Sequence, residues 1–161
     1  LSSENKIMEI ASNVVKNKSC LYLGRGPLFP LALEGALKLK EVSYIHAEGF
    51  SAGEMKHGPI ALIEEGMPVI SLLANDQHSI KTISNLREAL ARGAKIIIFA
   101  DEGTENDIDF AHEILRLPFL QETISPIITS IPIQLLAYHT AVAKGTDVDQ
   151  PKNLAKSVTV E

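Results

Sequence analysis

Four short apolar runs, separated by longer amphipathic segments, constrain the fold more than any other feature of the sequence. They cover residues 19–24, 68–74, 94–100 and 112–118. The third run, AKIIIFA, is the clearest strand, and the fourth is weaker and suits an edge position. Strands that are apolar at consecutive residues are buried on both faces, which is typical of parallel sheets. We therefore expect an α/β fold, with a parallel sheet covered by helices on each side.

Helix-like segments lie before, between and after these runs. They cover residues 1–18, about 30–46, 77–92 and 124–144, with a short helical turn at 59–64. In the first and third of the long segments, apolar residues recur every three or four positions, which places them on one helix face. Pro132 leaves two alternatives for the last segment: a kink at that residue, or a helix that starts nearer Ile131. Gly145 is expected to end it.

Composition excludes several function classes for this chain of 161 residues. The net charge is −5 and no Lys/Arg cluster occurs, so nucleic-acid binding is not expected. The longest apolar runs fall far short of the roughly 20 residues of a membrane span. A single cysteine rules out an internal disulfide and fits a reducing, cytoplasmic compartment. The sequence starts without methionine or a signal peptide, so we expect a piece of a longer protein.

The stretch 33–59 holds the strongest candidate for a site. Glu34, Lys38 and Glu41 are spaced i, i+4 and i+7, so on a helix they form one narrow stripe. Spacing alone favours a solvated face, where such pairs contribute only about 0.2–0.5 kcal/mol each. The alternative is catalytic, because a carboxylate beside a lysine near a cleft can act as a general base.

The charged stripe is followed by a loop that is broken by Gly49, Gly53 and Gly58. His57 stands near the end of this loop, in the sequence Lys-His-Gly-Pro, where an imidazole would be exposed and available for proton transfer. A lone histidine is more often structural, and the sequence leaves that alternative open. The other four histidines lack the spacing of metal ligands, so no metal site is expected.

Two further polar positions directly follow strands. The segment Gly-Arg-Gly at 24–26 comes after the first run, and Asp101 comes after the third. Ligands of parallel α/β sheets bind beyond the carboxyl ends of the strands, so both should face that edge, and the loop around His57 can reach it. Gly-x-Gly lacks the further glycine of a dinucleotide fingerprint, so a tight turn is expected. Cys20 lies inside a strand and is expected in the core.

Residues 145–161 form a polar tail without periodicity, which by default would be a disordered terminus. Its few apolar residues and Pro151 leave a second alternative open, in which the tail packs against the domain. A packed tail would deliver Lys156 into a cleft. A desolvated lysine has a lowered pKa and can form an imine with a ketone.

Three segments together resemble one family over nearly the whole chain. They are residues 23–26 (LGRG), 32–63 and 134–161, and the closing DQPKNLAKSVTVE is the most specific part together with EGALKLKE and AEGFSAGEMKHGP. The chain resembles the isomerising glutamine–fructose-6-phosphate aminotransferases. The resemblance implies that residues 1–144 are the second of two sugar isomerase (SIS) domains and that 145–161 are a C-terminal tail. The implied fold is a flavodoxin-like three-layer αβα sandwich on a five-stranded parallel sheet.

The resemblance implies catalytic roles for three residues. Glu41 corresponds to the base that moves a proton between C1 and C2 of a sugar imine. His57 corresponds to the histidine that opens the fructose ring, which the family supplies from the partner subunit of a homodimer. Lys156 corresponds to the lysine that forms a Schiff base with the C2 ketone. Each role suits the chemistry of its side chain.

The resemblance also implies the rest of the site and its partners. Glu34 and Lys38 are polar neighbours of the base, and Ala155 contributes a backbone contact to the sugar. The substrates are fructose 6-phosphate and glutamine-derived ammonia, the product is glucosamine 6-phosphate, and no metal or organic cofactor is needed. The family's glutaminase and first SIS domains are absent here, and residues 24–30 carry no hydroxyl for a phosphate cradle. The chain alone is therefore expected to be inactive.

A second hypothesis is a non-catalytic SIS module that binds sugar phosphates as a regulator. The presence of Glu41, His57 and Lys156 favours the enzyme, because a sensor needs neither a base nor an imine lysine. The SIS fold dimerises, so an isolated domain is also expected to expose an apolar face meant for its missing partner.

Overall fold

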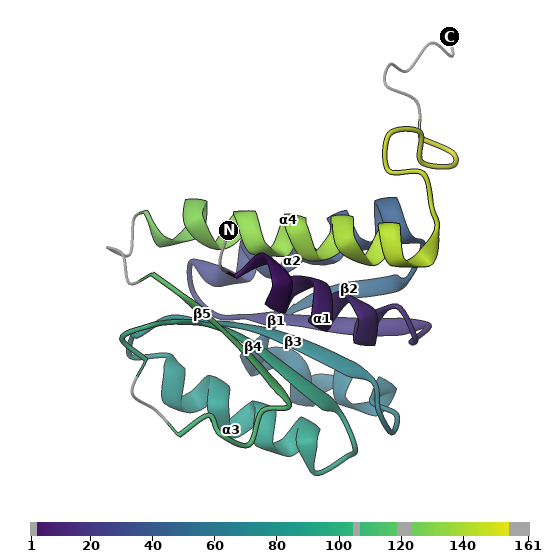
Figure 1. Cartoon of the computed structure of the whole chain (residues 1–161). Helices are drawn as coiled ribbons and strands as arrows, with labels where there is room; N and C mark the ends of the chain where they lie inside the picture. Colours follow the sequence, from purple (N-terminus) through teal and green to yellow (C-terminus); the bar gives the residue numbers. More distant parts are fainter. Residues whose placement is uncertain (1–2, 105–106, 119–123, 155–161) are drawn as a thin grey trace, which may run out of the picture.

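One sheet of parallel strands forms the centre of the molecule (Figure 1). The computed structural model describes residues 3–104, 107–118 and 124–154. The strands follow the order β2-β1-β3-β4-β5, and every neighbouring pair is parallel. Their bounds are β1 Ser19–Gly24, β2 His46–Ser51, β3 Pro68–Leu73, β4 Lys95–Asp101 and β5 Glu113–Leu117. The predicted five-stranded parallel sheet is confirmed, with β5 at one edge.

Helices cover both faces of the sheet and complete a three-layer αβα sandwich. α1, α2 and α4 lie over one face, and α3 lies over the other with the 3-10 helices η1 and η2 (Figure 1). Their bounds are α1 Glu4–Val14, α2 Leu28–Ser43, η1 Ala52–His57, η2 Pro59–Leu62, α3 Ser79–Leu90 and α4 Ser125–Lys144. This arrangement confirms the fold class that the sequence predicts.

Two apolar cores, one on each face of the sheet, explain why the strands are apolar at consecutive positions. In β1, Cys20 and Tyr22 belong to the core under α1, α2 and α4. Leu21 and Leu23, the alternating residues, belong to the core under α3 and η1. Successive strand side chains point to opposite faces, so a sheet covered on both sides buries all of them. Cys20 is fully buried, as the sequence predicts.

The edge strand β2 is missing from the four runs that the sequence pattern identifies. Its sequence, HAEGFS, lacks a continuous apolar run, and most of its residues are only partly buried. The interpretation of residues after His46 as a loop is therefore wrong for 46–51. Gly49 lies so close to α2 that an added Cβ would stand 2.7 Å from the Ala32 carbonyl oxygen. Glycine inside a strand commonly marks such a close backbone approach.

Helix ends differ from the predicted ones by a few residues. α1 is shorter than the predicted segment 1–18, and α2 starts two residues before Pro30. Tyr44 ends α2 because it adopts a left-handed conformation with φ of 58°. α4 includes Pro132 inside its length, so the alternative of a start near Ile131 is wrong.

α4 is long and apolar enough to cross a membrane by length and composition, and it is the one described helix that meets this test. Core helices of globular domains meet the same test. α4 packs beside α1 and α2 in the upper layer of Figure 1, and its buried residues include Ile133, Leu136 and Ala137. These contacts account for the apolar residues on the buried face of α4.

Candidate active site

The stripe on α2 forms a compact charged group. The Lys38 ammonium lies 2.8 Å from a carboxylate oxygen of Glu41 and 3.9 Å from one of Glu34. The hydrogen bond to Glu41 raises the pKa of Lys38, burial opposes this, and the negative charges of Glu41 and Glu34 add to the increase. Lys38 therefore stays protonated at neutral pH and faces two carboxylates. The three side chains therefore interact with one another while each remains partly exposed to solvent.

The fold directs this stripe away from the sheet. Ala32, Gly35, Ala36 and Leu39 form the buried face of α2. Gly35 brings the helix close to β1, because an added Cβ would stand 2.7 Å from the ring of Tyr22. Once this face packs on the sheet, residues about half a turn away must point outward.

A cavity of about 270 Å³ lies beside the stripe, between α2, α4 and the C-terminal tail. Its lining residues are Lys38, Val42, Gln134, Ala137, Tyr138, Val148 and Asp149. The side chains of Lys38 and Glu41 are only 36% and 28% exposed. Lys38 is therefore part of a concave wall, which is the kind of place where ligands bind.

The end of α4 and the start of the tail are attached to the end of α2. The Lys144 ammonium donates a hydrogen bond to the Ser43 carbonyl oxygen over 2.7 Å, and the Thr146 hydroxyl lies 2.7 Å from the Val42 carbonyl oxygen. The tail then rises beyond α4 in Figure 1. Lys156 and Ala155, the two predicted site residues of the tail, lie outside the described residues.

His57 does not join the stripe within one chain. It is exposed at the end of η1, which follows the carboxyl end of β2 and packs on α3. Glu41 lies in the last turn of α2, on the opposite face and next to the start of β2. β2 alone spans roughly 17 Å. The segment around His57 consists of two 3-10 helices rather than a loop, and Lys56 fixes it through an ion pair of 2.5 Å with Glu88 of α3.

The carboxyl edge of the sheet carries the other polar positions that the sequence places there. The Arg25 guanidinium lies beside Gly53, 3.4 Å from where a Cβ would stand, and the His78 ring packs against Gly26. Asp101 ends β4 and is almost fully buried. Burial raises the pKa of Asp101, and the negative charge of Asp76 adds to this increase. A hydrogen bond donated by the backbone N–H of Asn75 opposes it.

Replacing Asp101 by asparagine is expected to raise the stability of the domain at neutral pH. The folded state holds the Asp101 proton above the pH at which the unfolded chain loses it. The free energy of unfolding therefore falls as pH rises from about 4 through the raised pKa of the folded state. Asparagine keeps an acceptor for the Asn75 N–H and does not titrate. Thermal unfolding from pH 3 to 8 would show a gain that grows with pH, and a gain of equal size at pH 3 would contradict this account.

Comparison with known proteins identifies the family. Residues 13–144, most of the chain, match the model of the SIS domain. This chain belongs to the SIS domain family. A glutamine–fructose-6-phosphate aminotransferase [isomerizing] of Rhizobium meliloti is 58% identical over 162 aligned positions, and the same enzyme of Brucella abortus is also 58% identical. The alignments cover 99% and 100% of this chain, but only 26% and 27% of those proteins.

A solved structure gives the same result. The C-terminal domain of glucosamine-fructose-6-phosphate aminotransferase from Francisella tularensis is 44% identical, with a TM-score of 0.88. The match covers 92% of this SIS domain and 42% of that chain. A putative phosphosugar isomerase from Silicibacter pomeroyi, 26% identical, has a TM-score of 0.74 over 86% of this SIS domain. The SIS domain therefore corresponds to a part of each of these larger proteins.

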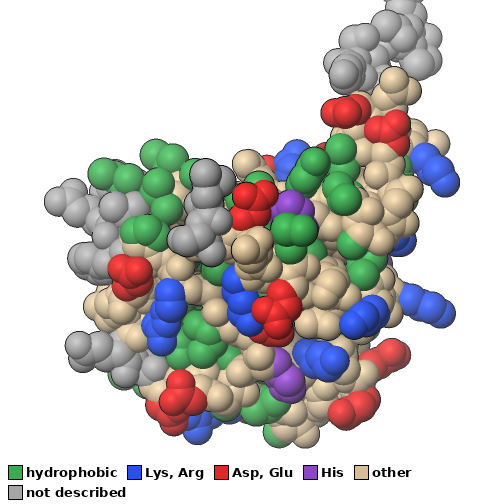
Figure 2. Space-filling model, in the orientation of Figure 1, with side chains coloured by type: hydrophobic (Ala, Val, Ile, Leu, Met, Phe, Trp, Pro, Cys, Tyr) green, Lys and Arg blue, Asp and Glu red, His purple; other side chains and the backbone are tan. Residues whose placement is uncertain are grey.

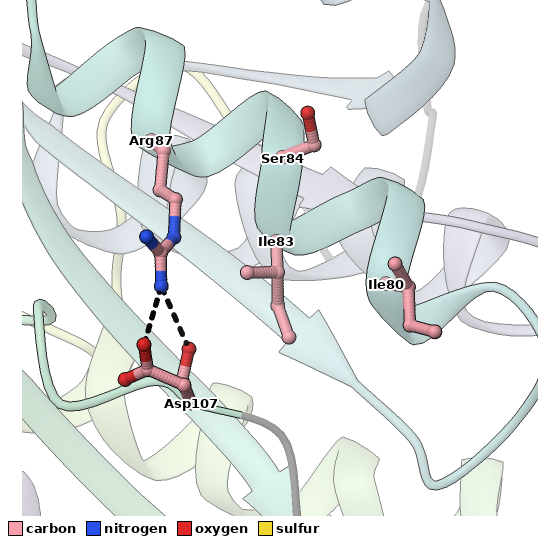
Figure 3. A pocket seen from close by; sticks show the side chains of 5 residues that line it. All are labelled: Ile80, Ile83, Ser84, Arg87 and Asp107. Carbon is pink, nitrogen blue, oxygen red and sulfur yellow. Dashed lines mark hydrogen bonds and ion pairs between the residues drawn. The ribbon is translucent and has the colours of Figure 1, made fainter.

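Other concavities among the described residues lie away from the stripe. One is a shallow groove on α3 lined by Ile80, Ile83, Ser84, Arg87 and Asp107 (Figure 3). Its Arg87 is held by an ion pair of 2.7 Å to Asp107, which leaves an apolar floor with few free polar groups. Another lies at the amino ends of the strands, where substrates of parallel sheets do not usually bind. No group of three metal-ligating side chains occurs among the described residues.

Sequence reasoning did not identify Tyr44 as a residue of the candidate site. Tyr44 lies next to the stripe, and its hydroxyl accepts a hydrogen bond from the backbone N–H of Lys152 over 2.6 Å. A contact between residues 108 positions apart has no local signal in the sequence.

Proposed function

We propose that this chain is the C-terminal part of an isomerising glutamine–fructose-6-phosphate aminotransferase. Residues 1–144 are its second SIS domain, and residues 145–161 are its C-terminal tail. Such an enzyme converts fructose 6-phosphate and glutamine-derived ammonia to glucosamine 6-phosphate. The 58% sequence identity to a protein of that name supports the proposal. The observation that carries it is the attachment of the tail to the end of α2, because this brings the chain leading to Lys156 to the helix that holds Glu41.

The reaction proceeds from an open-chain sugar. His57 of a second copy transfers the protons that open the ring of fructose 6-phosphate. The Lys156 amine then attacks the C2 carbonyl, and water leaves as the imine forms. Ammonia adds to this imine and displaces the lysine. Glu41 takes a proton from C1 of the resulting ketimine and returns it to C2. The proton of the C1 hydroxyl passes to the nitrogen, so that C1 becomes the aldehyde and the imine becomes the amine of glucosamine 6-phosphate.

Lys38 keeps Glu41 ready for this proton transfer. Its ammonium donates a hydrogen bond to the Glu41 carboxylate over 2.8 Å and so holds in place the oxygens that would accept the proton. Glu34 holds the other side of the ammonium, at 3.9 Å. The two acidic residues therefore have unequal roles: Glu41 acts on the substrate, and Glu34 and Lys38 shape and charge the wall around it.

The apolar residues beside the stripe are proposed to contact the missing parts of the enzyme. Leu33 and Leu37 of α2 are 46% and 42% exposed, and Ile127 and Ile131 of α4 are 65% and 50% exposed. Figure 2 shows hydrophobic side chains at the surface on the α4 side of the molecule. The first SIS domain is proposed to cover this face and to supply the phosphate-binding groups that residues 24–30 lack. The separated domain is accordingly inactive, and the whole enzyme is a cytoplasmic homodimer.

The competing function is a regulatory module that binds sugar phosphates without chemistry. Such a module needs neither a general base nor a lysine that forms an imine, so the presence of Glu41 and Lys156 favours the enzyme. Covalent trapping separates the two functions, because a sensor forms no imine.

The test is borohydride reduction of the full-length enzyme in the presence of fructose 6-phosphate. We expect a sugar adduct on Lys156, located by mass spectrometry, and its loss in Lys156→Arg, since a guanidinium cannot form the imine. Lys152→Arg, four residues earlier in the same tail, is the matched control and should keep the adduct. An adduct that persists in Lys156→Arg, or none in the unaltered enzyme, would reject the proposed chemistry.

A further inference from the structure

Tyr44 has an unusual backbone conformation for its position. It ends α2 in the left-handed region, with φ of 58° and ψ of 18°. Glycine usually occupies such a helix end, because a side chain is strained there. The ring is also 37% exposed, so core packing does not explain the choice. Strained residues that persist are often kept for function, which directs attention to the Tyr44 side chain.

The side chain of Tyr44 holds one residue of the tail in two ways. Its hydroxyl accepts the backbone N–H of Lys152 over 2.6 Å. The Lys152 ammonium lies over the face of the same ring, 5.7 Å from its centroid, which is within the range of a cation–π contact. Both contacts depend on the aromatic ring with its hydroxyl, which glycine cannot provide.

The tail between its anchors is also shaped. Thr146 binds the end of α2, and the Asp147 carboxylate accepts the N–H groups of Asp149 and Gln150 over 2.9 and 3.1 Å. This turn bends the chain back so that Lys152 reaches Tyr44. Residues 146–152 of the tail are therefore a loop held at both ends, and Val148 and Asp149 of this loop line the cavity beside Lys38.

We infer that Tyr44 is a positioning residue, a clamp that holds the tail at Lys152 beside the end of α2, and that the proposed reaction depends on this attachment. The inference rests on the proposed function and adds a residue to it. Lys156 follows Lys152 by four residues, a span of at most about 14 Å. Glu41 precedes Tyr44 by three residues, or about 5 Å along the helix. Fixing Lys152 on Tyr44 therefore reduces the length of chain between this anchor and Lys156 to four residues.

Two substitutions in the full-length enzyme test the clamp. Tyr44→Phe removes the hydroxyl that binds Lys152 and keeps the ring. Tyr44→Gly removes both contacts and also relieves the backbone strain. We expect amide exchange in residues 147–154 to accelerate about three- to tenfold in Tyr44→Phe and more in Tyr44→Gly, as the loss of one hydrogen bond implies. The kcat should fall by similar factors, while KM changes less than twofold because the sugar phosphate is held elsewhere.

Stability separates a clamp from a structural cap. Tyr44→Gly should leave the melting temperature unchanged or higher, although kcat falls, whereas loss of a structural residue would lower both together. The matched control is Tyr22→Phe, which removes a buried hydroxyl without a partner among the described residues and should change neither tail exchange nor kcat. Unchanged exchange of residues 147–154 in both Tyr44 variants would overturn the inference.

Failure of the clamp differs from failure of the proposed function. If borohydride traps Lys156 equally fast in the unaltered enzyme and in both Tyr44 variants, the imine chemistry stands and the clamp is wrong. If no enzyme is trapped, yet tail exchange accelerates in the variants, the clamp exists but does not serve imine formation, and the positioning role is rejected with the proposed function.

Discussion

Replacing Glu41 by glutamine in the full-length enzyme is expected to lower the formation of glucosamine 6-phosphate by about 10²- to 10⁴-fold, the usual contribution of a general base. The amide has nearly the size of the carboxylate but cannot take a proton from C1. Lys38 keeps Glu34 as a second partner at 3.9 Å, so its ammonium is not left without a counter-charge. Product formation from fructose 6-phosphate and added ammonia measures the isomerase step by itself.

The matched control for this substitution is Glu34→Gln. Like Glu41→Gln, it removes one negative charge from this helix face and one ion pair from Lys38. The ion pair that it removes is the longer of the two, at 3.9 Å rather than 2.8 Å. We expect a loss of less than about tenfold, because an exposed pair of this kind contributes little. Hydrolysis of glutamine should continue in both variants, which shows that the enzyme is folded. Equal losses in the two variants would mean that Glu41 acts through its charge alone and not as the base.

Mixing two inactive variants is expected to restore activity. Glu41 and His57 lie on opposite faces of the sheet and at opposite ends of β2, so one chain does not bring them together. In a symmetric dimer that shares its sites, a heterodimer of Glu41→Gln and His57→Ala has one site with both substitutions and one with neither. Random exchange of subunits makes half of the dimers heterodimers, so about a quarter of all sites become intact.

The measurement is the isomerase rate after the two variants are unfolded and refolded together, compared with each variant refolded alone. Recovery of about a quarter of the unaltered rate supports a site built from two copies. A mixture of Lys156→Arg and His57→Ala should behave in the same way, because the tail starts on the face of Glu41. Rates that merely average those of the two variants would place His57 and Glu41 in one chain and would contradict the arrangement proposed here.

The sequence predicts those parts of the fold that local patterns encode. β1, β3, β4 and β5 are recognisable because burial on both faces requires apolar side chains at consecutive positions. β2 has no such pattern, because it is an edge strand whose residues are mostly half-buried. Its Gly49, which resembles a loop signal, instead allows Ala32 of α2 to approach the strand. A glycine that serves packing and one that serves a turn have the same appearance in a sequence.

The candidate site, like the fold, was only partly predictable from the sequence. The spacing of Glu34, Lys38 and Glu41 determines that they share a helix face, because 3.6 residues complete one turn. Spacing does not determine which way that face points. Packing of Gly35 on Tyr22 decides this, since it buries the opposite side of α2 and leaves the stripe beside a cavity.

The sequence by itself determined the residue types that the proposed chemistry needs and the alternation of strands and helices that carries them. Only the tertiary structure decided that His57 is separated from Glu41 by the sheet, and that the tail returns to α2 at Tyr44. Local periodicity follows from the geometry of one element, whereas contacts between residues 108 positions apart depend on how the elements pack. That packing is set by the two cores as a whole, and no short stretch of the sequence encodes it.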